Sequence, residues 1–503
     1  MIVRISDDAL ARALGADELA LAFANKGHEV HRTSSWGMHW LEPLVEIDGT
    51  GFGPATLADV DAILDGSSPK SIGRIEDHPF IAKQQRLTFA RAGKTRSTSL
   101  EDYEATGGWA GLRRARQIGG AQIVEEVTRS GLRGRGGAGF PAGIKWKTVA
   151  STPGAQKYIV CNADEGDSGT FADRMVMEGD PYALMEGMAI AGEAVGATQG
   201  YIYVRSEYPD SIRKLNEALQ LCAEIIAPFR CEVRVGAGAY VCGEETSLLN
   251  SLEGKRGEVR AKPPLPAIEG LFGKPTVVNN VLTLAAVPHI VSEGGAALYE
   301  SLGIARSKGT MPIQLAGNIK HGGLFETAFG ITLSELIYDI GGGTESGRPV
   351  KAVQVGGPLG AYIHPDEFDI RFDYEEYTAA DALIGHGGIT VFDDTADMGA
   401  MARFAMEFCA AESCGKCTPC RIGAGADAVE ALPVMHNAPK GGRLPEQEIG
   451  LLTDLCETMK FGSLCALGGF TPYPVMSALR NWPEDFMPGK EGAVEKVLDR
   501  NEA

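Results

Sequence analysis

Hydrophobic positions change their period repeatedly through the middle of the chain, which predicts strands that alternate with helices. The apolar run at 158–162 is typical of a buried strand, and further strands are predicted at 201–205 and 232–235. Segments with helical periodicity, 182–195 and 211–226, separate these runs. Strand–helix alternation of this kind predicts a parallel sheet with right-handed crossovers.

The first 66 residues carry an α/β pattern of their own. It predicts a short strand, an amphipathic helix over about residues 7–26, strand-rich segments to residue 47 and a closing helix over 57–64. This order is compatible with a thioredoxin-like fold. The first cysteine is Cys161, so the unit has no thiol pair for disulfide chemistry or for holding a cluster. We interpret it as a docking module.

The remaining segments complete a multi-domain α/β prediction. Serine, proline and glycine break up residues 67–116, which we interpret as a linker packed along a surface. Short strands around one helix at 333–340 predict a small β-grasp-like (SLBB) module, and the chain after it is largely helical. The predicted units are a thioredoxin-like domain (1–66), the linker (67–116), a Rossmann-like parallel-sheet domain (117–310), the β-grasp-like module (311–394) and a helical domain (395–503).

Composition and charge exclude several classes of function. Lys+Arg 47 against Asp+Glu 66 gives a net charge of −19, which argues against a nucleic-acid partner because phosphate neutralisation needs clustered cations. We find no run of 18 apolar residues and no basic-then-apolar start, so we expect neither a membrane span nor a secretory signal. Ten cysteines beside a metal motif suit a reducing cytoplasm better than a disulfide framework.

Four cysteines have the spacing of a metal centre. Cys414, Cys417 and Cys420 can present three thiolates from one loop, and Cys465 can supply a fourth from a later loop. Thiolates select soft metals, so structural zinc and a [4Fe–4S] cluster both fit. Zinc motifs usually come as two separated pairs, so the triplet with one remote cysteine favours the cluster.

A glycine-rich stretch after a predicted helix contains a second candidate site. Gly134, Gly136 and Gly139 fit G-x-G-x-x-G, a spacing that lets backbone amides approach a phosphate or a planar ring. A dinucleotide fingerprint should follow a strand and open a helix, whereas here a helix precedes the motif and Pro141 interrupts the segment after it. We therefore expect a glycine-lined flavin or nicotinamide pocket and no standard Rossmann crossover.

Polar side chains cluster where predicted strands end. Carboxylates and amides occur at 162–170, at 243–246 and at 279–280. Such groups at the carboxyl ends of strands are well placed to bind sugar hydroxyls and ring N–H groups, although each segment alone also fits an ordinary polar turn. Their joint occurrence suggests one shared ligand.

Taken together, these motifs resemble the NADH-binding flavoprotein family. That family includes the F subunit of respiratory NADH dehydrogenase and the diaphorase subunits of soluble NAD-linked hydrogenases and formate dehydrogenases. The resemblance covers about residues 110–485 and implies FMN, a [4Fe–4S] cluster and NAD(H) as cofactors. It is carried by Gly134–Pro141, Lys145–Trp146, Cys161–Glu165, Gly238–Thr246, Asn279–Asn280 and the four cysteines.

The resemblance also implies a set of site residues. Cys414, Cys417, Cys420 and Cys465 would hold the cluster. Asp167 stands in the cofactor-binding segment where many members have Glu, and Thr148 and Leu265 stand where aromatic residues can stack on NADH. Phe140, Glu165, Tyr240 and Lys262 would lie around the nicotinamide nucleotide. The residues that would border FMN are Gly134, Arg135, Gly136, Gly137, Lys145, Asn162, Asp164, Gly243, Glu244, Glu245, Asn279 and Asn280.

The N-terminal unit looks like that of the β subunit of soluble formate dehydrogenase, or of the hydrogenase diaphorase. We predict the formate enzyme, with a large molybdenum/iron–sulfur subunit and a small [2Fe–2S] subunit as partners. Hydride would pass between NAD(H) and FMN, and no side-chain acid or base is assigned. The alternatives are a diaphorase of an NAD-reducing hydrogenase, an NADH-quinone oxidoreductase F subunit, a non-enzymatic electron-relay or docking scaffold, and a structural zinc protein.

Overall fold

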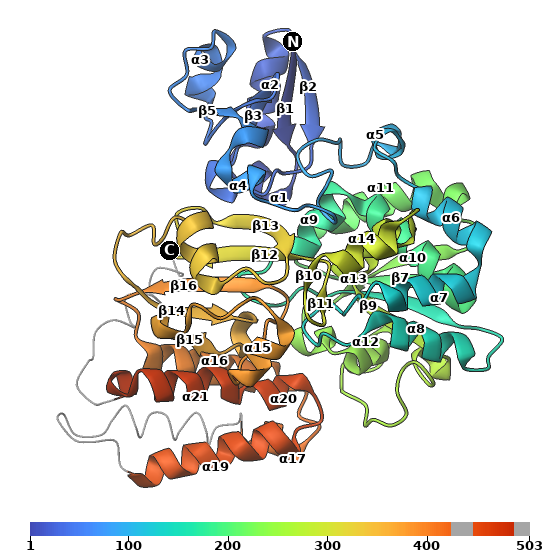
Figure 1. The fold of residues 1–503 in the computed structure, drawn as a ribbon, viewed down its shortest axis with the longest axis vertical. Helices are drawn as coiled ribbons and strands as arrows, with labels where there is room; N and C mark the ends of the chain where they lie inside the picture. Colours follow the sequence, from blue (N-terminus) through green and yellow to red (C-terminus); the bar gives the residue numbers. More distant parts are fainter. Residues whose placement is uncertain (424–445, 487–503) are drawn as a thin grey trace.

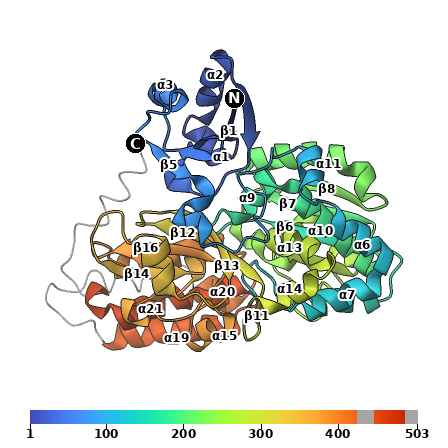
Figure 2. The ribbon, with the colours of Figure 1, turned by 45° about the horizontal axis from the view of Figure 1, so that its top comes forward.

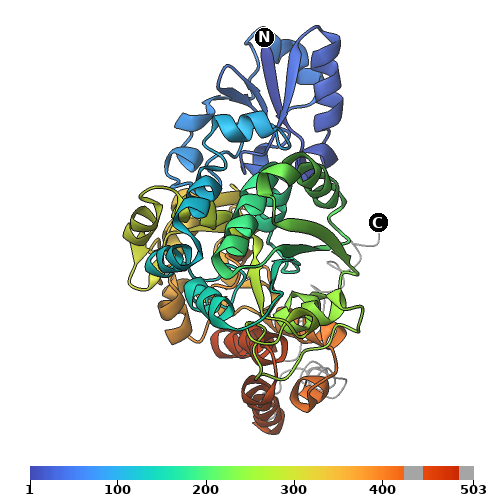
Figure 3. The same ribbon diagram turned by 90° about the vertical axis from the view of Figure 1, so that its right-hand side faces the viewer.

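The computed structural model describes residues 1–423 and 446–486 (Figure 1). Three larger sheets, a two-stranded hairpin and a helical region make up this part of the chain. The N-terminal unit lies at one end of the long axis and the C-terminal helices lie at the other, as Figure 3 also shows from the side. No single helix within the described ranges is long and apolar enough to cross a membrane.

A five-stranded sheet, in the order β2-β1-β3-β4-β5, forms the N-terminal unit. The predicted first helix is divided into α1 (Ala9–Ala13) and α2 (Ala16–Asn25), because Gly15 between them has a left-handed φ of +100°. A third helix, α3 (Val60–Leu64), follows. The strands are β1 (Ile2–Ser6), β2 (Glu29–Thr33), β3 (Val45–Ile47), β4 (Thr50–Phe52) and β5 (Ser71–Arg74).

The predicted linker contains regular structure. Strand β5 lies in it and completes the N-terminal sheet. One buried carboxylate, Glu186, orders its later part: it accepts hydrogen bonds from the Tyr103 hydroxyl at 2.6 Å and from the backbone N–H groups of Trp109 and Leu112. The helices are α4 (Pro79–Ala82), α5 (Leu100–Ala105), α6 (Ala110–Ile118) and, beyond the linker, α7 (Gly120–Arg129).

The central unit confirms the predicted parallel sheet. Its strands run in the order β8-β7-β6-β9 and all pair in parallel. They are β6 (Tyr158–Ala163), β7 (Gln199–Arg205), β8 (Arg230–Gly236) and β9 (Thr276–Asn280). The helices are α8 (Ala142–Ser151), α9 (Ala172–Gly179), α10 (Pro181–Val195), α11 (Pro209–Ile226), α12 (Glu245–Leu252), α13 (Val281–Val291) and α14 (Gly295–Ser301).

Helices α10 and α13 fill the centre of this unit. Both are apolar around most of their circumference because they pack against each other and against the sheet, so almost every residue of each is buried. Together α13 and α14 have the composition of a membrane span, but they meet at a 119° break and α13 lies inside the core.

A mixed sheet beside the central unit follows the order β13-β12-β16-β14-β15 (Figure 2). Strands β12 and β16 pair in parallel and the other neighbours pair antiparallel. The predicted helix at 333–340 is a π-helix over Glu335–Ile340, and α15 (Tyr374–Ala379) was not predicted. The strands are β12 (Thr310–Gly317), β13 (Gly323–Ala328), β14 (Val350–Val355), β15 (Tyr362–Ile363) and β16 (Gly388–Asp393), preceded by the small hairpin β10 (Gly303–Ile304) and β11 (Ser307–Lys308).

Helices make up the described part of the C-terminal region, as predicted. They are α16 (Met398–Glu412), α17 (Thr418–Gly423), α19 (Glu446–Gly462), α20 (Ala466–Phe470) and α21 (Pro472–Asn481). The predicted helical domain also included residues 424–445 and 487–503, which lie outside the described residues.

Candidate functional site

The glycine-rich loop lies against the end of strand β9. Its ends are held together by the hydrogen bond from Gly134 N to the Phe140 carbonyl, 2.9 Å long. A Cβ atom placed on Gly136 would lie 2.9 Å from Cβ of Asn280, closer than real contacts allow, whereas Gly137 has a φ of +111°. Glycine is therefore required at both positions, for close approach at the first and for backbone conformation at the second.

Three of the predicted polar segments meet at one edge of the sheet. Strands β6 and β9 are neighbours, and their register places Asn162 opposite Asn280. The Asn162 side chain donates a 2.7 Å hydrogen bond to the carbonyl of Gly243, in the turn before α12. Asn279 is buried and accepts a hydrogen bond from the Trp146 indole, so its side chain joins α8 to β9.

Asp164 presents an unsatisfied carboxylate oxygen at this edge. Its Oδ2 atom is buried and has no hydrogen-bond partner among the described residues. Burial raises the pKa of Asp164 to about 7, although the guanidinium of Arg205 opposes the shift. A buried acceptor of this kind requires a partner, and a ligand hydroxyl would supply one.

Two lysines and two glutamates form a charged cluster beside the glycine turn. Glu244 caps α12 by accepting hydrogen bonds from two backbone N–H groups, and Nζ of Lys262 lies 3.0 Å from it and 2.8 Å from Glu245. Lys145 Nζ lies 3.0 Å from the other oxygen of Glu245. Burial acts to raise the pKa of Glu245, but the two ammonium groups outweigh it and the net pKa is lowered. The Glu245 carboxylate is thus ionised at neutral pH, with cations on two sides.

Some of the predicted site residues have other contacts in the structure. The Arg135 guanidinium is buried and donates to the Tyr299 hydroxyl and to the Lys308 carbonyl, so only the backbone of Arg135 can border a ligand. Glu165 is also buried and accepts hydrogen bonds from backbone N–H groups at the start of α9. Phe140 and Leu265, by contrast, are about half exposed.

A cavity of about 270 Å³ adjoins these residues. Glu165 and Asp167 line one side, and Asp167 accepts a 2.7 Å hydrogen bond from the Tyr240 hydroxyl. The remaining lining was not predicted from the sequence; it includes Arg205 at the end of β7 and two phenylalanines of α16. The position of Arg205 at the end of a predicted parallel strand was the available signal. The missed lining residues are Arg205, Glu207, Tyr208, Pro358, Phe404 and Phe408.

The four motif cysteines lie together between the C-terminal helices. Cys465 is the residue before α20. Burial raises its pKa to about 11, and the nearby Glu244 and Cys420 act in the same direction, whereas hydrogen bonds from the backbone N–H groups of Leu467 and Gly468 lower the pKa. Burial also raises the pKa of Cys420, and Cys414 and Cys417 act in the same direction. Four sulfur donors of this kind, three from one loop and one from another, fit a thiolate-bound metal centre.

Direct contacts join the cysteine region to the polar edge of the sheet. Glu244, which pairs with Lys262, lies close enough to Cys465 to affect its pKa. Glu412, two residues before Cys414, accepts a 2.8 Å hydrogen bond from the backbone N–H of Tyr240. A ligand at the glycine loop and a metal centre at the cysteines would therefore be neighbours.

Comparison with known proteins agrees with both parts of this site. Residues 127–289 match the model of the Nuo51 FMN-binding domain, and residues 400–488 match the NADH-ubiquinone oxidoreductase-F iron-sulfur binding region. These matches confirm the predicted cofactors, which are FMN, a [4Fe–4S] cluster and NAD(H), and they favour the cluster over zinc at the cysteines.

Relatives match most of the chain. The NADP-reducing hydrogenase subunit HndC of Solidesulfovibrio fructosivorans is 44% identical over 414 residues, covering 80% of this chain and 83% of the relative. The F 2 subunit of the NADH-quinone oxidoreductase of Rhizobium meliloti (strain 1021) is 42% identical, covering 77% and 93%. Among solved structures, NAD+-reducing [NiFe]-hydrogenase in the air-oxidized state matches with a TM-score of 0.70 and 28% identity, covering 97% of this chain and 85% of that chain.

Proposed function

The chain belongs to the family of NADH-quinone oxidoreductase F subunits and related hydrogenase subunits, and from that premise we propose that it is the diaphorase subunit of a multi-subunit oxidoreductase. It would exchange two electrons with NAD(H) and single electrons with a partner subunit. FMN supplies the step between these modes, because it takes up two electrons as a hydride and can release them singly.

The observation that carries this proposal is the buried Asp164 Oδ2 atom, which has no hydrogen-bond partner within the described structure and could accept a ribityl or ribose hydroxyl. Lys145 would offset phosphate charge, and the glycine loop would admit a planar ring. We propose the FMN-bordering residues to be Gly134, Arg135 (by its backbone), Gly136, Gly137, Lys145, Asn162, Asp164, Gly243, Glu244, Glu245, Asn279 and Asn280. Those around the nicotinamide nucleotide would be Phe140, Glu165, Asp167, Tyr240 and Lys262, and the cluster ligands Cys414, Cys417, Cys420 and Cys465.

Two tryptophans of the N-terminal unit have a structural role. Trp40 packs edge-on against Phe80, with ring centroids 4.7 Å apart, and Trp36 belongs to the same hydrophobic core as the strands of the mixed sheet. This stretch joins the N-terminal unit to its neighbour, so it carries little information about the electron donor.

We therefore base the proposed type of electron-exchanging partner on the known relatives of this chain. They support a hydrogenase-type or quinone-reductase-type complex more than the formate dehydrogenase expected from the sequence. Metal analysis and a hydrogen-oxidation assay of the complex purified from its native source separate the three. Nickel or hydrogen oxidation supports the hydrogenase type, molybdenum the formate dehydrogenase type, and none of these the quinone-reductase type.

Electron transfer by the chain itself is tested without the partner. The reconstituted protein should contain FMN, iron and sulfide, and should reduce ferricyanide with NADH. FMN binding without any turnover would instead favour the electron-relay or docking scaffold. A protein that binds neither FMN nor iron would overturn the proposal.

A further inference from the structure

His386 reaches from the mixed-sheet unit into the carboxylates of the central unit. It lies just before β16, between Gly385 and Gly387. Its Nε2 atom is 3.1 Å from Oδ1 of Asp173, and its Nδ1 atom is 3.7 Å from Oε1 of Glu165. All three side chains are at most 6% exposed, so the cluster is fully enclosed. No sequence pattern singled out His386 among the nine histidines.

The hydrogen bonds of this cluster favour a cationic histidine over a bound metal. Each oxygen of Glu165 accepts a backbone N–H from the start of α9, and the Tyr208 hydroxyl adds a further donor. Asp173 accepts from the Asn280 amide at 2.6 Å on one oxygen and faces His386 on the other. All four carboxylate oxygens thus accept a hydrogen bond or face the imidazole, which leaves none free for a metal and favours a protonated His386 as their partner.

Asp173 and Asn280 connect His386 to the glycine loop. The Asn280 side chain, held by Asp173, is the one against which a side chain at Gly136 would clash. The backbone makes a second connection, since Gly137 and Gly385 form a β-bridge between the two units. His386 is thus connected to the wall of the proposed flavin pocket in two ways: its side chain contacts Asp173, and the backbone of its neighbour Gly385 pairs with Gly137.

We propose that His386 is a positioning residue of the flavin site, which holds the Asn280 carboxamide beside Gly136 through Asp173 and supplies the positive charge that balances the buried carboxylates there. This inference rests on the proposed function, because it requires FMN at the glycine loop.

The charges that face His386 determine the expected pH dependence. They are Asp173 on α9 and Glu165 and Asp167 in the segment after β6. Burial acts to lower the pKa of His386, but these carboxylates, Asp173 foremost, outweigh it and raise the pKa to about 9. The imidazole is therefore a cation at neutral pH. Since reduction adds negative charge to a bound flavin, the cation favours the reduced form, and this contribution is lost as the pH rises through about 9.

The test compares flavin binding and flavin potential in the full chain with FMN and cluster present. His386→Gln is expected to weaken FMN binding about tenfold, which corresponds to the loss of about one hydrogen bond. It should also disfavour flavin reduction about tenfold, which for a two-electron couple is about 30 mV. The wild-type potential should show a break near pH 9, and the variant should lack it. His364→Gln, a part-exposed histidine, is the control.

Asp173→Asn provides a second, independent arm. Removing the carboxylate that contributes most to the His386 shift should move the break to lower pH, and combining it with His386→Gln should cost less than the sum of the two single effects. The proposal is overturned if both single variants keep the wild-type FMN affinity, potential and pH break. A wild-type chain that binds no FMN at the glycine loop would instead refute the proposed function.

Discussion

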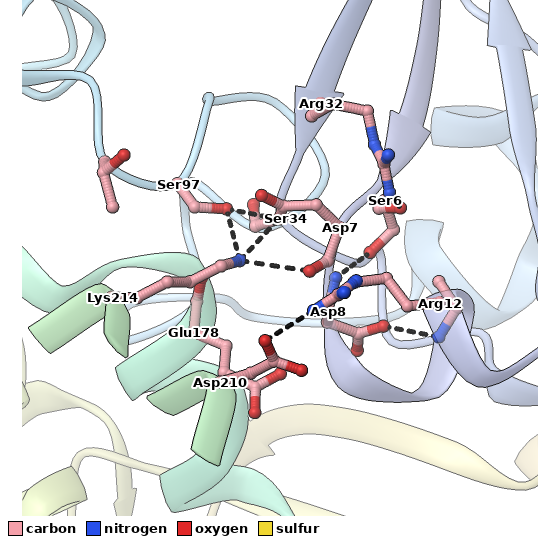
Figure 4. A network of polar contacts seen from close by, with 12 residues as sticks. Ser6, Asp7, Asp8, Arg12, Arg32, Ser34, Ser97, Glu178, Asp210 and Lys214 are labelled. Atoms are coloured by element: carbon pink, nitrogen blue, oxygen red, sulfur yellow. Dashed lines mark hydrogen bonds and ion pairs between the residues drawn. The ribbon is translucent and has the colours of Figure 1, made fainter. Parts of the chain in front are cut away.

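The ammonium group of Lys214 in α11 lies 2.6 Å from a carboxylate oxygen of Asp7 in the N-terminal unit, and the lysine side chain is 1% exposed (Figure 4). The same ammonium donates to the Glu178 carbonyl at the end of α9 and to the Ser97 hydroxyl. Glu178 in turn accepts a hydrogen bond from the backbone N–H of Ala9. A buried, fully partnered cation therefore fixes the N-terminal unit to the central unit.

Helix α9 extends this connection to the proposed flavin site. Its first turn carries Asp173, which faces His386, and its end carries Glu178, which contacts the N-terminal unit. Between them, Arg174 pairs with Glu178 and lies 3.7 Å from Asp8. The cysteine-free N-terminal unit therefore contributes to the environment of the carboxylates beside the pocket.

Replacing Lys214 should destabilise the whole described assembly. Lys214→Met leaves Asp7 without its buried counter-ion, which costs about 3 kcal/mol of unfolding free energy. Urea unfolding followed by circular dichroism measures it. The control is Lys26→Met, which removes an exposed pair with Asp61 and should cost less than about 1 kcal/mol. Equal effects of the two substitutions would show that the buried contact does not hold the units together.

Spacing and periodicity predicted the elements whose signal is local. The strands at 158–162 and 201–205 were predicted from short runs of mostly apolar residues and are present as β6 and β7. The choice of Cys465 as the fourth cluster ligand follows from spacing in the same way and stays a prediction. Strand β5 was missed since its residues, Ser-Ile-Gly-Arg, show no alternation of apolar positions and pair at an edge. His386 was missed for a different reason: its two carboxylate partners, Asp173 and Glu165, lie more than 200 residues away in sequence.

The buried Asp164 predicts how stability depends on pH in the protein without cofactors. Its pKa of about 7 in the folded state exceeds the ordinary value for aspartate, so the folded protein binds the proton more tightly than the unfolded protein does. The contribution of Asp164 to stability should therefore fall as the pH rises from about 4 towards 7. Asp164→Asn should remove this component of the slope, as thermal unfolding across that range would show. An unchanged slope would contradict the burial argument.

Removing the Asp164 carboxylate altogether should also weaken flavin binding. If the free oxygen accepts a ligand hydroxyl, Asp164→Ala should cost about 2 kcal/mol of FMN binding energy, or about thirtyfold in Kd. Fluorescence titration of FMN measures it. Asp61→Ala, at an exposed carboxylate, should leave the affinity unchanged.

Close packing of the glycine loop makes a separate prediction for Gly136. An added methyl group would overlap Cβ of Asn280, so Gly136→Ala should reduce stability by about 1–3 kcal/mol. Gly134→Ala is the matched control for stability, because its nearest neighbour would lie at an ordinary 3.6 Å and its φ is not left-handed. Comparable losses in both variants would indicate a general intolerance of the loop and not contact with Asn280.

The remote cysteine tests whether one metal centre joins the two loops. Cys465→Ser replaces a proposed thiolate ligand by a weak one, so iron and sulfide content should fall well below that of the wild type while FMN remains bound. Cys456→Ala is the matched control, because this buried thiol in α19 belongs to the hydrophobic core and is not proposed as a ligand. Metal analysis and electron paramagnetic resonance after reduction would measure both. Full iron content in Cys465→Ser would remove Cys465 from the proposed ligand set.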